Sequence, residues 1–108
     1  MSKGTLVLIP FPFTDLSGHK VRPALVLHNQ SGGEDCIVAF ITSIKPKKIN
    51  AYDVLILPTE NNGIKSTSVI KVSKIATLQK KIILGELGTI DPQVMVKVDS
   101  ELKNLFKI

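Results

Sequence analysis

The chain contains a single arginine, Arg22, and its thirteen other basic residues are all lysines. A guanidinium stays charged and can donate two parallel hydrogen bonds to one phosphate, a geometry that an ammonium does not offer. Arg22 follows a loop rich in proline and aromatic residues, 10–18, and precedes the apolar run Ala24–Leu27, so we expect a strand edge to hold it rigidly. The position suits a phosphate-binding role, but for an arginine considered alone a structural ion pair, for example with Asp15, is the favoured interpretation.

Other residues near the arginine have side chains that could contact the same ligand. Lys20 and the lysines of segment 45–48 could bind phosphates, or they could be ordinary solvated loop residues. Phe13 could stack on a base, whereas core burial is the favoured interpretation for Phe11. His19 titrates near neutral pH and could act as a general base, but a solvated loop histidine is the simpler interpretation.

The composition indicates a folded domain that favours an anionic partner. The 108 residues are 44% hydrophobic and carry a net charge of +5, and we expect residues 1–108 to form one domain. Cys36 is the only cysteine and lies in an apolar run, which predicts a small buried side chain. One cysteine and two distant histidines do not make a zinc site, so we expect no metal or cofactor. No signal peptide or membrane-spanning run is recognisable, and the cytoplasm is the expected location.

The elements that must position these residues are mostly strands. Short runs rich in Val, Ile, Leu and Thr alternate with turn sequences rich in Asp, Asn, Ser and Gly. Strands at this spacing are typical of a small barrel or sandwich. The predicted strands are 5–9, 23–28, 36–42, 54–57, 67–72 and 75–78.

The end of the chain predicts one amphipathic helix packed on the barrel. Asp91 is suited to the N-cap and Pro92 to the first helical turn. Because the run 36–41 is apolar on both faces, one face needs cover from the helix or from a second subunit, and we predict a symmetric homodimer. Apolar residues of the helix recur every three or four positions, at Val94, Val98, Leu102 and Leu105.

An ordered set of segments along nearly the whole chain resembles the MazF/PemK family of toxin ribonucleases. No segment is specific alone, but the set is specific in its order and spacing. Members of this family often carry arginine where this chain has Ala76, a departure that removes a possible phosphate contact or structural pair. The matching segments are 4–11, 22–27, 40–43, 63–70, 74–78, 87–90 and the final helix.

The resemblance implies a small β-barrel, SH3-like or CcdB-like, that is packed by a C-terminal helix, forms a dimer and cleaves single-stranded RNA at short motifs without a metal. It also implies a cognate antitoxin whose tail covers the RNA-binding surface, and a toxin–antitoxin complex that binds DNA. By the same resemblance the catalytic residues are Arg22, Thr42 and Ser43. The residues expected to bind RNA are Phe13, Asp15, His19, Lys20, Pro23, Lys45 and Lys47.

The implied chemistry uses the RNA's own 2′-hydroxyl, which attacks the adjacent phosphate and leaves a 2′,3′-cyclic phosphate and a 5′-hydroxyl. Arg22 is suited to stabilising the added negative charge and could donate to the leaving oxygen. It is less suited to abstracting a proton, because a guanidinium stays protonated in proteins. Thr42 would hydrogen-bond a phosphate oxygen, and its alternative is a strand-end hydroxyl bonded to backbone. Ser43 has the same alternative and a weaker functional case.

Two other functions stay open at this point. One is a non-catalytic toxin on the same scaffold, as in the CcdB-type gyrase inhibitors, which act by binding a protein. The other is an SH3-like module that binds RNA without cleaving it, with strongly salt-dependent affinity. Cleavage of RNA that is lost with Arg22 would favour the nuclease over both alternatives.

Overall fold

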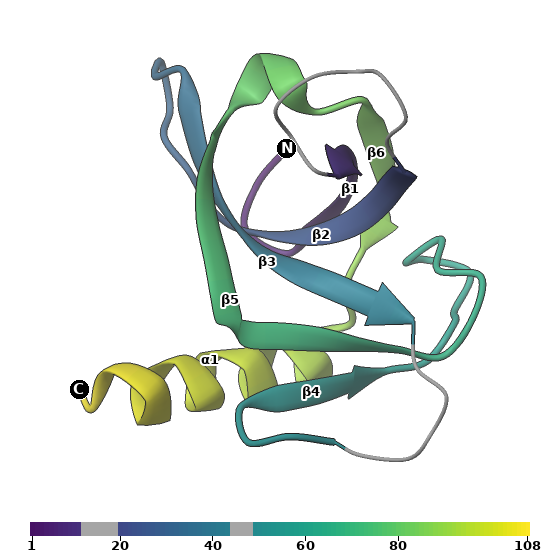
Figure 1. Ribbon diagram of the computed structural model, residues 1–108, viewed down its shortest axis with the longest axis vertical. Helices are drawn as coiled ribbons and strands as arrows, with labels where there is room; N and C mark the ends of the chain where they lie inside the picture. Colours follow the sequence, from purple (N-terminus) through teal and green to yellow (C-terminus); the bar gives the residue numbers. More distant parts are fainter. Residues whose placement is uncertain (12–19, 44–48) are drawn as a thin grey trace.

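The computed structural model describes residues 1–11, 20–43 and 49–108 of the chain. Within these residues six strands form one antiparallel sheet in the order β4-β5-β3-β2-β1-β6. The sheet curls into a half-barrel, and one helix lies along β4 and β5 (Figure 1). The elements are β1 (Thr5–Phe11), β2 (Lys20–Asn29), β3 (Asp35–Ser43), β4 (Asp53–Ile56), β5 (Ser68–Gln79), the 3-10 turn η1 (Lys80–Ile82), β6 (Gly85–Thr89) and α1 (Pro92–Phe106).

The curl of the sheet depends on β5, which turns sharply along its length (Figure 1). Its register with β3 shifts between Ala39 and Phe40, whose partners are Ile75 and Lys71. A bulge of this kind bends a strand and increases its twist. The prediction of two separate strands, 67–72 and 75–78, is therefore wrong, because the polar residues between them lie in a bulge within one continuous strand.

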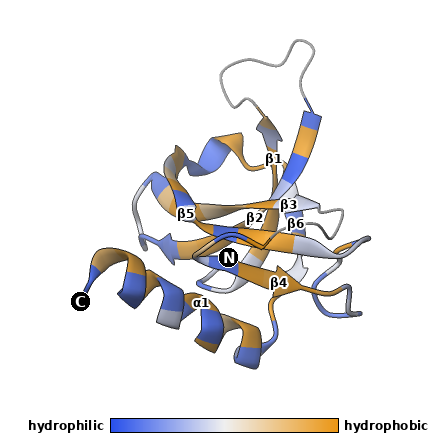
Figure 2. Cartoon of the chain, turned by 60° about the horizontal axis from the view of Figure 1, so that its bottom comes forward, coloured by the Kyte–Doolittle hydropathy of each residue, from blue (hydrophilic) through white to orange (hydrophobic). Residues whose placement is uncertain are grey.

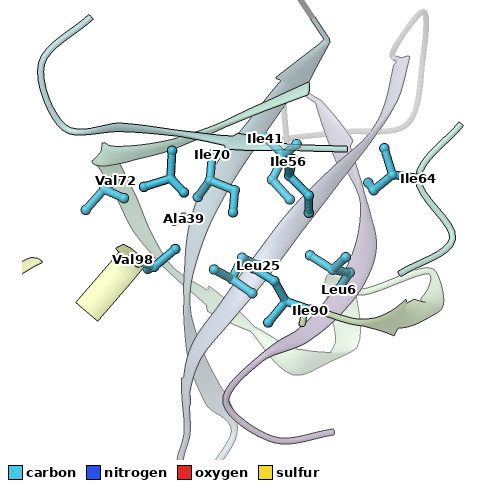
Figure 3. Packing of buried hydrophobic residues seen from close by; sticks show 11 residues of the cluster. Leu6, Leu25, Ala39, Ile41, Ile56, Ile64, Ile70, Val72, Ile90 and Val98 are labelled. Carbon is cyan, nitrogen blue, oxygen red and sulfur yellow. The ribbon is translucent and has the colours of Figure 1, made fainter. Parts of the chain in front are cut away.

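The core occupies both faces of the central strands. Side chains that alternate along β3 enter two clusters: Ala39 and Ile41 enter one, and Cys36 and Val38 enter the other. Cys36 is buried as predicted, and this burial raises the pKa of its thiol. Because the chain covers both faces of β3 itself, this strand gives no argument for a second subunit, and the homodimer stays a prediction. Figure 3 shows the first cluster, which includes Leu6, Leu25, Ala39, Ile41, Ile56, Ile70, Val72 and Val98.

Helix α1 confirms the amphipathic pattern at the end of the chain. Asp91 occupies the N-cap position and Pro92 the first turn, although the Asp91 side chain makes no capping hydrogen bond. Apolar and polar residues alternate around the helix (Figure 2), and no helix of the described residues is long and apolar enough to cross a membrane. Met95, which was not predicted, packs on the first cluster. All four predicted residues belong to this cluster or pack on it too: Val94, Val98, Leu102 and Leu105.

Strand β6 is absent from the sequence-based prediction because its sequence, GELGT, contains two glycines and no β-branched residue before its end. It forms by pairing with the distant strand β1. The loop between β4 and β5 packs closely against it: Gly63 has a φ of 68°, and a Cβ there would lie 2.5 Å from the carbonyl oxygen of Leu87. Only glycine fits both the conformation and the close approach.

Candidate active site

Pro23 marks the point at which β2 separates from β3. The described pairing of these strands begins at Ala24 and Phe40, whereas β2 stays paired with β1 as far as Lys20. Proline has no N–H to donate to a ladder, so it favours such a separation. Strand β2 begins at Lys20 rather than at the predicted Pro23, which places Arg22 inside the strand, opposite Ile9.

Two cavities lie at the separated ends of β2 and β3, and Arg22, Pro23 and Ile41 line both of them. The first, about 520 Å³, is lined by Thr42 and is called here the Thr42 pocket. The second, about 610 Å³, is lined by Ser43 and is called the Ser43 pocket. Because successive side chains of a strand point to opposite faces, the neighbouring residues Thr42 and Ser43 line different pockets.

Arg22 is held against aromatic rings and keeps an unsatisfied donor. Its guanidinium carbon lies 5.4 Å from the centroid of the Phe11 ring, within cation–π range. Its Nε is buried and has no hydrogen-bond partner among the described residues. Neither of the ion pairs recorded among these residues includes Arg22. An unpaired buried N–H costs about 1–3 kcal/mol, and more for a charged group. The Nε donor is therefore unsatisfied among the described residues, and Arg22 lines both pockets.

Phe11 lines the Thr42 pocket and is 39% exposed, so its predicted core burial is wrong. Strand β1 continues beyond the buried residues Ile9 and Pro10, and Phe11 is its exposed last residue. There its ring packs edge-on against Phe40, with centroids 6.0 Å apart and an interplanar angle of 79°. Two aromatic rings and the guanidinium thus form one wall of the pocket.

The predicted pair Thr42 and Ser43 is divided between the two pockets. The Thr42 hydroxyl donates a hydrogen bond to the carbonyl of Ser43 at 3.3 Å, which is long for an O–H···O bond. A weakly bonded hydroxyl is free to turn toward a ligand beside Arg22. Ser43 is exposed and faces the other pocket, together with Lys20 and Lys65.

Two lysines of β5 also line the Thr42 pocket and were not predicted as site residues. Lys71 is largely buried and forms an ion pair with Asp53, whereas Lys74 is exposed. Lys71 lies between two apolar residues of the predicted strand 67–72, and Lys74 lies between that strand and the next predicted one. Neither position carries a local signal of function, because the bulge that brings both to the pocket depends on the pairing with β3.

The remaining predicted site residues divide into two groups. Lys20 and Pro23 are described, and Pro23 borders both pockets. Ala76, where family members often carry arginine, pairs with Val38 and packs against the second core cluster. Five predicted residues lie outside the described residues: Phe13, Asp15, His19, Lys45 and Lys47.

The Thr42 pocket combines a fixed guanidinium, a hydroxyl, two ammonium groups and two aromatic rings. Cationic donors suit a phosphate, and aromatic rings suit an unstacked base. No three His, Cys, Asp or Glu side chains gather to hold a metal ion within the described residues. The chemical character of the pocket is that of a site for a single-stranded nucleotide chain.

Comparisons with known proteins show the family and the fold of the chain. Residues 2–106 match the model of the PemK-like, MazF-like toxins of type II toxin-antitoxin systems. No curated protein sequence matches the chain significantly. Sixty solved chains or more match it in structure.

Three of these solved structures show how closely the fold agrees. MazF in a MazE–MazF complex from Deinococcus radiodurans has a TM-score of 0.79 at 23% identity, covering 100% of this chain and 97% of that chain. An endoribonuclease in complex with its cognate antitoxin, from a mycobacterial species, has a TM-score of 0.77 at 18% identity, covering 100% of this chain and 96% of that chain. The Mycobacterium tuberculosis toxin MazF-mt6 has a TM-score of 0.75 at 19% identity, covering 96% of this chain and 97% of that chain.

At these identities the structural likeness establishes the fold, a half-barrel with a C-terminal helix, as predicted. The match over residues 2–106 goes further, because it spans both separated strand ends and the final helix. The chain belongs to the family of PemK-like, MazF-like toxins of type II toxin-antitoxin systems.

Proposed function

We propose that this toxin is a metal-independent endoribonuclease that cleaves single-stranded RNA in the Thr42 pocket. The observation that carries the proposal is that Arg22, whose buried Nε has no partner among the described residues, lines the same pocket as Thr42. The endoribonucleases among the structurally similar proteins support it through their shared fold. The neighbouring Phe11 and Phe40 rings offer faces for the bases on either side of the scissile bond.

In the proposed reaction the 2′-oxygen attacks the adjacent phosphorus, and the bond from phosphorus to the 5′-oxygen breaks. The 2′-hydroxyl proton passes to water, and the leaving oxygen takes a proton from water, so the products are a 2′,3′-cyclic phosphate and a 5′-hydroxyl. Arg22 stabilises the negative charge that grows on the phosphate oxygens and donates a hydrogen bond to the leaving oxygen. Thr42 turns its hydroxyl from the Ser43 carbonyl to a phosphate oxygen.

Ser43 has a different role in this proposal from the one the sequence suggested. It lies in the Ser43 pocket with Lys20 and Lys65, on the other side of β3 from Thr42. We assign it to binding of the flanking RNA, not to the reacting phosphate. His19 stays a predicted RNA-binding residue, and its position lies outside the described residues.

The proposal is tested by incubating the purified protein with single-stranded RNA in EDTA and mapping both ends of each fragment. We expect cleavage that leaves cyclic phosphates and 5′-hydroxyls, and loss of cleavage in Arg22→Ala with an unchanged circular dichroism spectrum. RNA that stays intact, or cleavage that survives Arg22→Ala, would overturn the assignment. Salt-dependent RNA binding without cleavage would favour the binding module instead.

The proposed toxin would also have the partners that its family implies. We infer a cognate antitoxin, because two of the structurally similar proteins are toxins in complex with an antitoxin. We also propose a homodimer, a DNA-binding toxin–antitoxin complex and a cytoplasmic location, where single-stranded messenger RNA is accessible. Co-expression with the product of an adjacent small open reading frame, followed by size-exclusion chromatography, tests for the antitoxin and the dimer together.

A further inference from the structure

A buried ion pair adjoins the Thr42 pocket and is not explained by the proposed reaction. Lys71 of β5 and Asp53 of β4 stand opposite each other in the register of the two strands, and Nζ lies 2.9 Å from Oδ2. The Asp53 side chain is only 2% exposed and also accepts a hydrogen bond from the backbone N–H of Asn50 at 2.8 Å. The carboxylate is therefore fixed from two directions, and it fixes the ammonium in turn.

The two charges of this pair face different surroundings. Lys71 lines the Thr42 pocket with Arg22, whereas Asp53 lines a separate small cavity beside Lys97 and Glu101 of α1. The pair therefore presents its positive end to the pocket. An ammonium has three N–H donors, and the recorded bond to Asp53 uses one of them. Two donors are left for a ligand.

Stability alone does not account for a charged pair at this position. Replacing a buried ion pair by apolar residues of similar size is often neutral or stabilising, since both charges lose their hydration on burial. On its other side Lys71 is paired with Phe40, which packs against the second core cluster, so an apolar side chain at position 71 would have an apolar neighbour. A role in binding gives a reason for keeping a cation beside Arg22.

Resting on the proposed function, we propose that Lys71 is a second phosphate-binding residue of the Thr42 pocket, held in place by Asp53. Arg22 takes the scissile phosphate, and Lys71 takes a neighbouring phosphate of the same strand. Lys74 lines the same pocket but is exposed, and no ion pair of the described residues fixes it.

The test compares two ion pairs of nearly equal length. Lys3 and Asp99 lie 2.8 Å apart, but their side chains are 51% and 41% exposed and line neither pocket. The variants are Lys71→Met/Asp53→Asn and, as matched control, Lys3→Met/Asp99→Asn, which leave the net charge unchanged. The probe is a random-sequence 20-mer of 2′-fluoro RNA, which lacks the attacking hydroxyl, and its affinity is measured by fluorescence anisotropy across a salt series.

We expect the Lys71 variant to lose about tenfold in affinity at 0.1 M salt, and the slope of log K against log salt to flatten by about 0.7. The control variant should keep both values. Unchanged affinity and slope in the Lys71 variant would overturn the inference, as would an equal loss in the control. If asparagine at position 53 unfolds the chain, Lys71→Met/Asp53→Leu leaves no buried polar group and gives the same comparison.

Binding of an uncleavable RNA separates this inference from the proposed function. If the Lys71 variant binds the uncleavable RNA as tightly as the wild type while cleavage still depends on Arg22, Lys71 alone is removed from the site. A Lys71 effect on binding in a protein that does not cleave RNA would retain Lys71 as a phosphate-binding residue and overturn the nuclease.

Discussion

The two pockets at the separated ends of β2 and β3 carry similar charge but differ in how their groups are held. Each is lined by three cationic residues of the described chain, with Arg22 common to both. In the Thr42 pocket Arg22 lies against Phe11, Phe11 packs on Phe40, and Asp53 holds Lys71. The Ser43 pocket has Lys20 and Lys65, for which no ion pair is recorded within the described residues.

The difference teaches that positive charge alone does not locate the reaction. In the proposed mechanism, charge would attract RNA to either pocket, but a transition state is stabilised by donors already in place. The Ser43 pocket is built partly from a loop that Asn62 supports through hydrogen bonds to the backbone of Leu57, Thr59 and Ile64. This support shapes a surface, whereas the Thr42 pocket fixes individual charged groups. We therefore place catalysis in one pocket and binding of flanking RNA in the other.

The largest expected effect comes from replacing the guanidinium while keeping its charge. Arg22→Lys retains one positive charge but loses the planar pair of donors, so we expect the single-turnover cleavage rate to fall about a thousandfold. The affinity for 2′-fluoro RNA should stay within about threefold, because the charge remains. A cleavage rate within tenfold of the wild type would show that charge suffices and would remove the distinction between the pockets.

Neighbouring hydroxyls of β3 give a second and smaller contrast. Thr42→Val keeps the side-chain shape but removes a donor to the reacting phosphate, so we expect the cleavage rate to fall about a hundredfold. Ser43→Ala should change the rate less than about threefold, because Ser43 faces the other pocket. Single-turnover rates at saturating RNA measure both. A larger fall in cleavage rate in Ser43→Ala than in Thr42→Val would show that the reaction takes place in the Ser43 pocket instead.

A still smaller effect is expected from the aromatic wall. Phe11→Leu removes a stacking face and the cation–π contact with Arg22, so we expect KM to rise about tenfold, in keeping with 1–3 kcal/mol per stacked base. The matched control is Phe106→Leu at the end of α1, an exposed phenylalanine that lines neither pocket. Equal effects of the two substitutions on KM would show that Phe11 has no special part in binding.

Local sequence pattern was sufficient for the elements whose signal is local. The helix after Asp91 follows from its cap position, its proline and the spacing of its apolar residues. Strand β6 and the continuity of β5 were missed because both depend on distant partners: β6 pairs with β1, and the β5 bulge appears only in its register with β3. Pairing of this kind overrides weak intrinsic strand propensity.

The candidate site was predictable in part for the same reason. Arg22 stands out by residue type, and Thr42 and Ser43 by resemblance to a family. The separation of Thr42 from Ser43 follows from strand alternation once the strand is known. Lys71 needed the structure, because its significance comes from Asp53, eighteen residues earlier in the chain, and from the pocket that the β5 bulge forms.

The most direct test of the account is to locate bound RNA on the protein by NMR. The ¹⁵N-labelled toxin is titrated with 2′-fluoro RNA, and the amide shift changes are mapped onto the sheet. The account predicts changes that begin at Phe11, Phe40, Thr42 and Lys71 and extend to the Ser43 pocket only as the RNA lengthens. Shift changes confined to the loop of Gly63–Ser68 or to α1, with the Thr42 pocket unperturbed at saturation, would contradict it.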